Sequence, residues 1–170
     1  MKNAILVIVL LLTFSNLQAQ DTKKSDIPVV TIKDIDGKPF STAELKNEGK
    51  PMIVDFWATW CKPCVAEMPY FEQLHAKYKD QKVRVILVSL DVYRQLETKL
   101  IPFVEKNKIQ SRVLMLNEKD PNKYIDKIEP RWSGAIPATI FYKGKKREFV
   151  EDHFEDLASL ESIVLQLTKS

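Results

Sequence analysis

Cys61 and Cys64 are the two cysteines of the chain, and two residues separate them in one short motif. At this spacing the second thiol is close enough to attack a mixed disulfide formed on the first. A bridge that closes so short a loop gains little from chain entropy, which makes a purely structural disulfide a weak alternative. Half of a zinc site is another alternative, but its remaining ligands are missing, because His75 and His153 show no ligand spacing. The motif therefore predicts a redox-active dithiol.

The segments on either side of the motif predict where it lies in the fold. Met52–Trp57 is apolar and β-branched, as a central strand should be. After the motif the apolar residues change to a helical repeat that runs from Val65 to Tyr78. We therefore expect Cys61 at a strand-to-helix junction, on the first residue of the helix.

That position suits the chemistry of a reactive thiolate. The unpaired N–H groups and the dipole at a helix start stabilise a negative sulfur, and Lys62 adds a positive charge beside Cys61. Pro63 fits the first helical turn, where its missing N–H is not needed. We expect Cys61 to be exposed and to react first, with Cys64 about one turn further along. Trp60 is expected either to shield the sulfur or to pack in the core.

The rest of the chain predicts an α/β protein. Strands alternate with helices through most of the sequence, and an antiparallel hairpin comes late. The expected elements are a hairpin over 27–40, a brief helix over 41–45, a strand over 83–90, a helix over 95–107 interrupted at Pro102, a strand over 113–116, a short helix over 121–128, a hairpin of strands 138–142 and 147–150, and a helix over 154–168.

The first residues indicate export. A positive start, the apolar run Ala4–Leu12 and a polar end at Ala19 are typical of a secretory signal peptide, residues 1–19. An uncleaved anchor is the alternative, although the apolar run is about half as long as a spanning helix needs. Residues 20–26 are polar and expected to be loose, which leaves 27–170 as the folded domain.

Composition limits the remaining function classes. The 170 residues carry a formal charge of +3, and 45% of them are hydrophobic, as in an ordinary globular domain. The Lys and Arg residues are spread along the chain, so there is no footprint for nucleic acid.

The run Val54-Asp55-Phe56-Trp57-Ala58-Thr59-Trp60-Cys61-Lys62-Pro63-Cys64 resembles the active-site segment of the thioredoxin superfamily. The leader, Ile35–Phe40 and Glu67-Met68-Pro69 resemble its TlpA/ResA-like branch of extracytoplasmic oxidoreductases. The resemblance implies a thioredoxin fold, with a central mixed β-sheet flanked by helices and an N-terminal β-hairpin extension. The fold class expected is therefore α/β.

The same resemblance assigns a substrate loop. The family has a cis-proline that faces the dithiol, and Gly134–Thr139 matches that loop. By itself Pro137 would indicate a trans proline at the start of a strand. With the resemblance, we expect Pro137 to be cis, and Ile136 and Pro137 to contact the substrate.

Two acids compete for the handling of the Cys64 proton. Asp55 lies inside an apolar strand, where an unpaired carboxylate is costly, and it matches the buried acid of classical thioredoxins. Glu67 lies one helical turn past Cys64 and matches the acid of ResA-like proteins. Either could instead be structural, Asp55 as a hydrogen-bonded acid and Glu67 as a solvated charge. The presence of both departs from either family pattern.

The resemblance implies a reductase that acts on exported proteins, in the bacterial periplasm, with the Cys61–Cys64 disulfide in place of a cofactor. It implies a membrane electron donor as partner, no metal, and a monomer. One alternative is a module that holds and delivers copper on the same cysteines. Another is a peroxiredoxin-like peroxidase, whose usual threonine three residues before the reactive cysteine is replaced by Ala58 or by Cys61.

Overall fold

The computed structural model describes residues 31–42, 45, 47 and 49–169. The predicted signal peptide, the segment 20–26 and part of the helix expected over 41–45 lie outside these residues. The strands are β1 (Thr31–Asp34), β2 (Pro39–Ser41), β3 (Met52–Trp57), β4 (Arg84–Ser89), β5 (Arg112–Met115), β6 (Ala138–Lys143) and β7 (Lys146–Val150). The helices are α1 (Lys62–Tyr78), α2 (Ile101–Lys106), α3 (Ile125–Ile128) and α4 (Leu157–Lys169).

The strands form one mixed sheet in the order β2-β1-β5-β4-β3-β6-β7. Strands β3, β4 and β5 are parallel, and β6 runs antiparallel to β3. The predicted α/β class, the mixed sheet with flanking helices and the thioredoxin-like fold are confirmed. Strand β3 lies between β4 and β6, so both of its edges are paired, and all its residues are buried.

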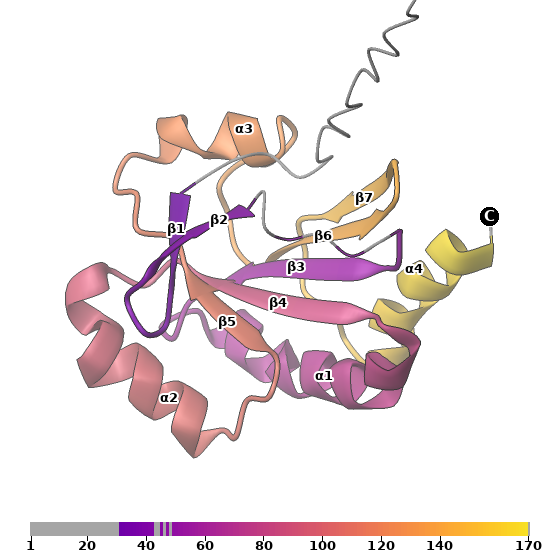
Figure 1. Ribbon diagram of the computed structural model, residues 1–170, viewed down its shortest axis with the longest axis horizontal. Coiled ribbons are helices and arrows are strands. Elements are labelled where there is room, and N and C mark those ends of the chain that lie inside the picture. Colours follow the sequence, from indigo (N-terminus) through magenta and orange to yellow (C-terminus); the bar gives the residue numbers. More distant parts are fainter. Residues whose placement is uncertain (1–30, 43–44, 46, 48, 170) are drawn as a thin grey trace, which may run out of the picture.

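Helices α1 and α4 lie on one side of the sheet and α3 on the other (Figure 1), and each face has its own apolar core. Ile53 and Trp57 of β3 pack with the buried side chains of α1 and α4. Val54 and Phe56 point to the opposite face, where Ile128 of α3 lies. Since side chains alternate along a strand, Asp55 lies on the same face as α1. The strand thus directs one carboxyl toward the helix that begins with the cysteines.

The predicted N-terminal hairpin is present as β1 and β2. Its turn contains Asp36 and Gly37, and Gly37 has a φ of +77°, which a residue without a side chain adopts most easily. Strand β1 also pairs with β5, and Arg112 of β5 forms an ion pair of 3.0 Å with Asp34. The hairpin therefore extends the sheet beyond β5.

The helix expected over 95–107 differs in form from the prediction. It contains a turn over Tyr93–Gln95, a wider π-type turn over Leu96–Leu100, and then α2. Pro102 does not interrupt it: this residue falls in the first turn of α2, where proline is well tolerated, and α2 continues to Lys106. The irregular turn comes before the proline.

Candidate active site

The dithiol lies at the junction between β3 and α1, as its flanking segments predict. Cys61 has extended backbone angles and caps α1, and its Sγ accepts a hydrogen bond of 3.3 Å from the backbone N–H of Cys64. The two cysteines are joined in a disulfide. The N–H that points at Cys61 Sγ would stabilise a thiolate there once the disulfide is reduced.

The expectation that Cys61 is exposed is wrong for this disulfide form. Only 5% of Cys61 is accessible, and Cys64 is fully buried. The backbone carbonyl oxygen of Ile136 lies 3.8 Å from Cys61 Sγ and covers part of it. Cys61 is still the more accessible of the two, which keeps it as the sulfur that an incoming group meets first.

The three other residues of the motif are all exposed. Trp60 is 62% accessible, which excludes packing in the core, and Lys62 and Pro63 also face solvent. Pro63 stands in the first turn of α1 as expected. The positive charge of Lys62 therefore lies at the helix start beside the disulfide.

The loop before β6 places the predicted substrate residues beside the disulfide. The Ile136–Pro137 peptide is cis, as expected, and the Ile136 carbonyl faces Cys61. Buried Trp132 supports this loop, because its Nε1 donates a hydrogen bond of 2.7 Å to the carbonyl of Ala135. This arrangement offers backbone groups of a fixed loop to a chain that approaches Cys61.

A buried acid that the sequence analysis missed fixes the other side of the motif. Asp91 follows β4, and its carboxylate accepts hydrogen bonds from the Thr59 N–H at 3.0 Å and the Thr59 hydroxyl at 2.7 Å. Ser89 donates a third hydrogen bond of 2.8 Å to the same carboxylate. Asp91 thereby ties the segment before Cys61 to the end of the neighbouring parallel strand. The sequence pattern that indicates this acid is a polar residue, Ser89, at the end of an apolar strand, with Asp91 two residues later.

Asp91→Asn is expected to lower the free energy of unfolding by about 1 kcal/mol, because one carboxylate oxygen becomes a donor and faces other donors. Chemical denaturation of the oxidised protein measures this change. Asp126→Asn, at an exposed acid on α3, is the matched control and should leave the denaturation midpoint unchanged. If the two substitutions change the free energy of unfolding equally, Asp91 does not stabilise the segment before Cys61.

Asp55 is fully buried and is a hydrogen-bonded acid. The hydroxyl of Thr139, its partner across the β3–β6 pair, donates to Asp55 Oδ1 at 3.1 Å. Oδ2 is buried without a hydrogen-bond partner. Burial raises the pKa of Asp55 well above its usual value, and the nearby Glu67 charge raises it further, against the lowering effect of the Thr139 hydroxyl.

Glu67 is also buried, so the alternative that it is a solvated charge on the helix surface is wrong. Its Oε2 accepts a hydrogen bond of 2.6 Å from the backbone N–H of Phe154, and its Oε1 is buried without a partner. Burial raises the pKa of Glu67 to about 7, although the Phe154 N–H and the nearby His153 act to lower it. At neutral pH this carboxyl is poised between its two protonation states.

Asp55, Cys64 and Glu67 are all buried, on the side of the sheet where β3 packs against α1. Glu67 is one helical turn from Cys64, and residues at this spacing have neighbouring side chains. The charge of Glu67 acts on Asp55, so the two carboxyls are close enough to influence each other. Both have one buried oxygen without a hydrogen-bond partner. The pair can hold or release a proton beside Cys64.

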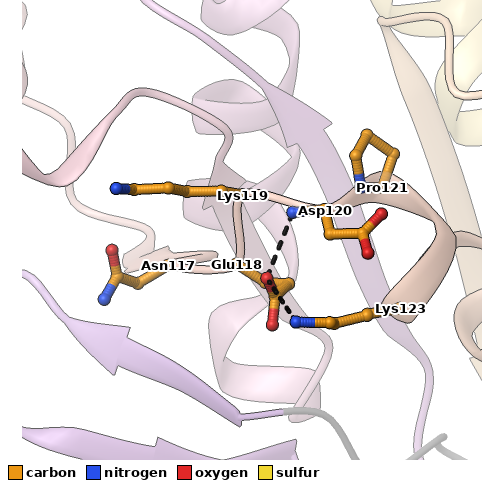
Figure 2. Close-up of a pocket in the computed structure, with 6 residues that line it drawn as sticks. All are labelled: Asn117, Glu118, Lys119, Asp120, Pro121 and Lys123. Carbon is orange, nitrogen blue, oxygen red and sulfur yellow. Dashed lines mark hydrogen bonds and ion pairs between the residues drawn. The ribbon is translucent and has the colours of Figure 1, made fainter.

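The structure also contains a surface pocket of about 640 Å³ after β5, shown in Figure 2. It is lined by Asn117, Glu118, Lys119, Asp120, Pro121 and Lys123. None of the predicted site residues lines it, and its Glu118 carboxylate is already bonded to Lys123 and to the Asp120 N–H. Within the described residues, no group of three or more His, Cys, Asp or Glu side chains is placed to hold a metal ion.

Comparison with known proteins finds similarity over most of the chain. Residues 24–147 match the model of the AhpC/TSA family. The thiol-disulfide oxidoreductase ResA of Oceanobacillus iheyensis is 54% identical over 52 residues, which cover 30% of this chain and 27% of that protein. The matches to this and the similar curated relatives thus span less than two fifths of the relatives' length.

Two solved structures extend the similarity to the whole domain. A thioredoxin-like protein from Porphyromonas gingivalis is 34% identical, with a TM-score of 0.61 over 85% of this chain and 92% of that one. A thiol:disulfide interchange protein of the thioredoxin family from Chlorobium tepidum is 25% identical, with a TM-score of 0.65 over 83% of this chain and 94% of that one.

Proposed function

Because the chain belongs to the AhpC/TSA family, within a thioredoxin-like fold, we propose that it is an extracytoplasmic thiol–disulfide oxidoreductase that reduces protein disulfides. The observation that carries the proposal is the Cys61–Cys64 disulfide at the start of α1, with the Ile136 carbonyl 3.8 Å from Cys61 Sγ. The similarity to proteins named thiol-disulfide oxidoreductase ResA supports the same reaction class.

The proposed reaction begins with the reduced dithiol. The Cys61 thiolate attacks one sulfur of a substrate disulfide, which forms a mixed disulfide and releases the other substrate sulfur as a thiolate. The Cys64 thiol loses its proton to the buried acids and then attacks Cys61 Sγ. The second substrate sulfur leaves, the Cys61–Cys64 disulfide forms, and two electrons have passed to the substrate. The disulfide form is the state that the structure contains.

Each turnover leaves the protein oxidised, so a reducing partner must restore the dithiol. We propose a membrane thiol donor on the outer side of the cytoplasmic membrane, consistent with the signal peptide predicted over residues 1–19. Among the residues that the structure describes, no helix has the length and apolar character needed to cross a membrane. The proposed chemistry uses the two sulfurs and no further cofactor.

An insulin-reduction assay with dithiothreitol as the electron source tests the proposal. The wild-type protein should accelerate reduction, and a Cys61→Ser/Cys64→Ser variant should remain at the dithiothreitol background. Consumption of hydrogen peroxide in the absence of disulfide reduction would instead assign the peroxidase alternative. Stoichiometric binding of Cu(I) with insulin reduction at background would assign the copper-binding alternative.

A further inference from the structure

Exposed apolar side chains lie on the two segments that meet at Thr59, two residues before Cys61. In the described part of the chain, four large hydrophobic residues are more than a third accessible: Trp60 at 62%, Val92 at 56%, Tyr93 at 44% and Leu165 at 39%. Leu165 lies on α4, whereas the other three belong to the two segments that Asp91 joins. We refer to Trp60, Val92 and Tyr93 as the Trp60–Tyr93 surface.

The hydrogen bonds of Asp91 hold this surface together. Trp60 directly follows Thr59, and Val92 directly follows Asp91, so both are one residue from a hydrogen-bonded pair. Because consecutive Cα atoms are about 3.8 Å apart, the Cα atoms of Trp60 and Val92 lie within about 16 Å of each other. Side chains at this separation can contact one segment of a bound chain.

Tyr93 is held in place although nearly half of it is accessible. The Lys33 ammonium lies 4.0 Å from the centroid of its ring. Its hydroxyl lies over the turn of the N-terminal hairpin, where a Cβ added to Gly37 would be 3.5 Å away. An exposed aromatic ring that is already ordered loses little conformational entropy when a partner covers it. The hairpin therefore presents Tyr93 for contact.

The apolar side chains have positive charges beside them. Lys62 and Arg94 are both exposed, and neither has an ion-pair partner among the residues that the structure describes. Lys33 adds a third cation on the Tyr93 ring, while Glu97 is the exposed acid nearest to Arg94 along the chain. A surface with an apolar centre and cationic edge is complementary to a segment with an apolar side chain and an acidic one.

We propose that Val92 and Tyr93, together with Trp60, form a docking surface that selects the substrate of the dithiol. The occupant is a segment of a disulfide-bearing protein that carries an aromatic or aliphatic residue and an acidic residue within a few positions of its reactive cysteine. This inference rests on the proposed function and names the class of substrate that the site prefers.

Two disulfide peptides of equal length provide the test, one with Phe and Glu beside the cysteine and one with Ser and Lys. Pre-reduced protein is mixed with each peptide under single-turnover conditions. The wild type should react about tenfold faster with the Phe/Glu peptide, the gain typical of one well-placed anchor residue. Val92→Ser/Tyr93→Ser should remove this preference, and Leu165→Ser, at the exposed apolar residue on α4, should retain it.

Hydroxyethyl disulfide has no peptide segment to dock, so it tests the proposed disulfide reduction separately from the docking surface. All variants should reduce it at the wild-type rate if the surface acts only in docking. A wild type that reduces this compound but shows equal rates with both peptides overturns the docking surface and leaves the proposed function intact.

Two other occupants of the surface would overturn the inference. If the wild type self-associates and the double serine variant does not, the surface binds a second copy of the chain. If the wild type binds anionic phospholipid vesicles and the double serine variant does not, the surface binds a membrane. A wild type inert toward every disulfide contradicts the proposed function and the inference with it.

Discussion

Asp55→Asn is expected to slow the resolution of a mixed disulfide on Cys61 by about a hundredfold near neutral pH, the lower range for loss of a general base. The carboxylate that receives the Cys64 proton must be a strong enough base to take it from a thiol. Burial and the Glu67 charge both raise the pKa of Asp55, so its carboxylate is a stronger base than that of an ordinary aspartate. Glu67→Gln should slow the step less, by about tenfold, and the double variant should be slower than either.

The measurement is the decay of a preformed mixed disulfide between Cys61 and a small thiol, followed against pH. The wild-type rate should rise with pH as the acids ionise, and Asp55→Asn should flatten this rise. Asp126→Asn, at an exposed acid on α3, is the matched control and should follow the wild-type profile. A larger loss in Glu67→Gln than in Asp55→Asn would assign Glu67 as the main proton acceptor.

The stability of the oxidised protein is expected to fall as pH rises from 5 to 8, a window that Glu67 sets. Its carboxyl titrates near its ordinary value in the unfolded chain and at about 7 in the folded protein. Between these values the folded state holds more protons than the unfolded state, so the free energy of unfolding decreases with pH. Since one pKa unit corresponds to about 1.4 kcal/mol, the loss is roughly 2–3 kcal/mol. Asp55 acts in the same direction, because burial raises its pKa in the folded protein as well.

Urea denaturation at a series of pH values checks this expectation. Glu67→Gln keeps an oxygen that can accept from the Phe154 N–H but cannot ionise, so it should be more stable than the wild type at pH 8 by roughly 2 kcal/mol. The same substitution should have little effect at pH 5. If wild-type stability rises over this range, the two acids are not held neutral by burial.

The elements that carry the dithiol were predictable from the sequence. The apolar run of β3 and the helical repeat of α1 are local patterns, and they place Cys61 at the junction without reference to the rest of the chain. The burial of Asp55 also follows from its position inside such a strand. The π-type turn before Pro102 was not predictable, because propensity does not distinguish it from an ordinary helical turn.

The surroundings of the site depend on contacts between distant segments. Glu67 lies on the buried stripe of α1, yet its hydrogen-bond donor, Phe154, is 87 residues away. Asp91 reaches Thr59 across 32 residues. Cys61 is covered by a carbonyl 75 residues further along, which the motif itself does not reveal. Local patterns therefore predict where the reactive sulfurs lie, and tertiary contacts decide how they are supported and covered.

The central claim is that Cys61 attacks the substrate and Cys64 resolves the resulting mixed disulfide. Its most direct measurement uses Cys64→Ser and Cys61→Ser, each mixed in the reduced form with a disulfide peptide and analysed by intact mass. Cys64→Ser should accumulate a stable peptide adduct on Cys61, whereas Cys61→Ser should form little adduct because Cys64 is fully buried. Equal accumulation of adduct on both variants, or adduct on Cys64 only, would contradict the assignment.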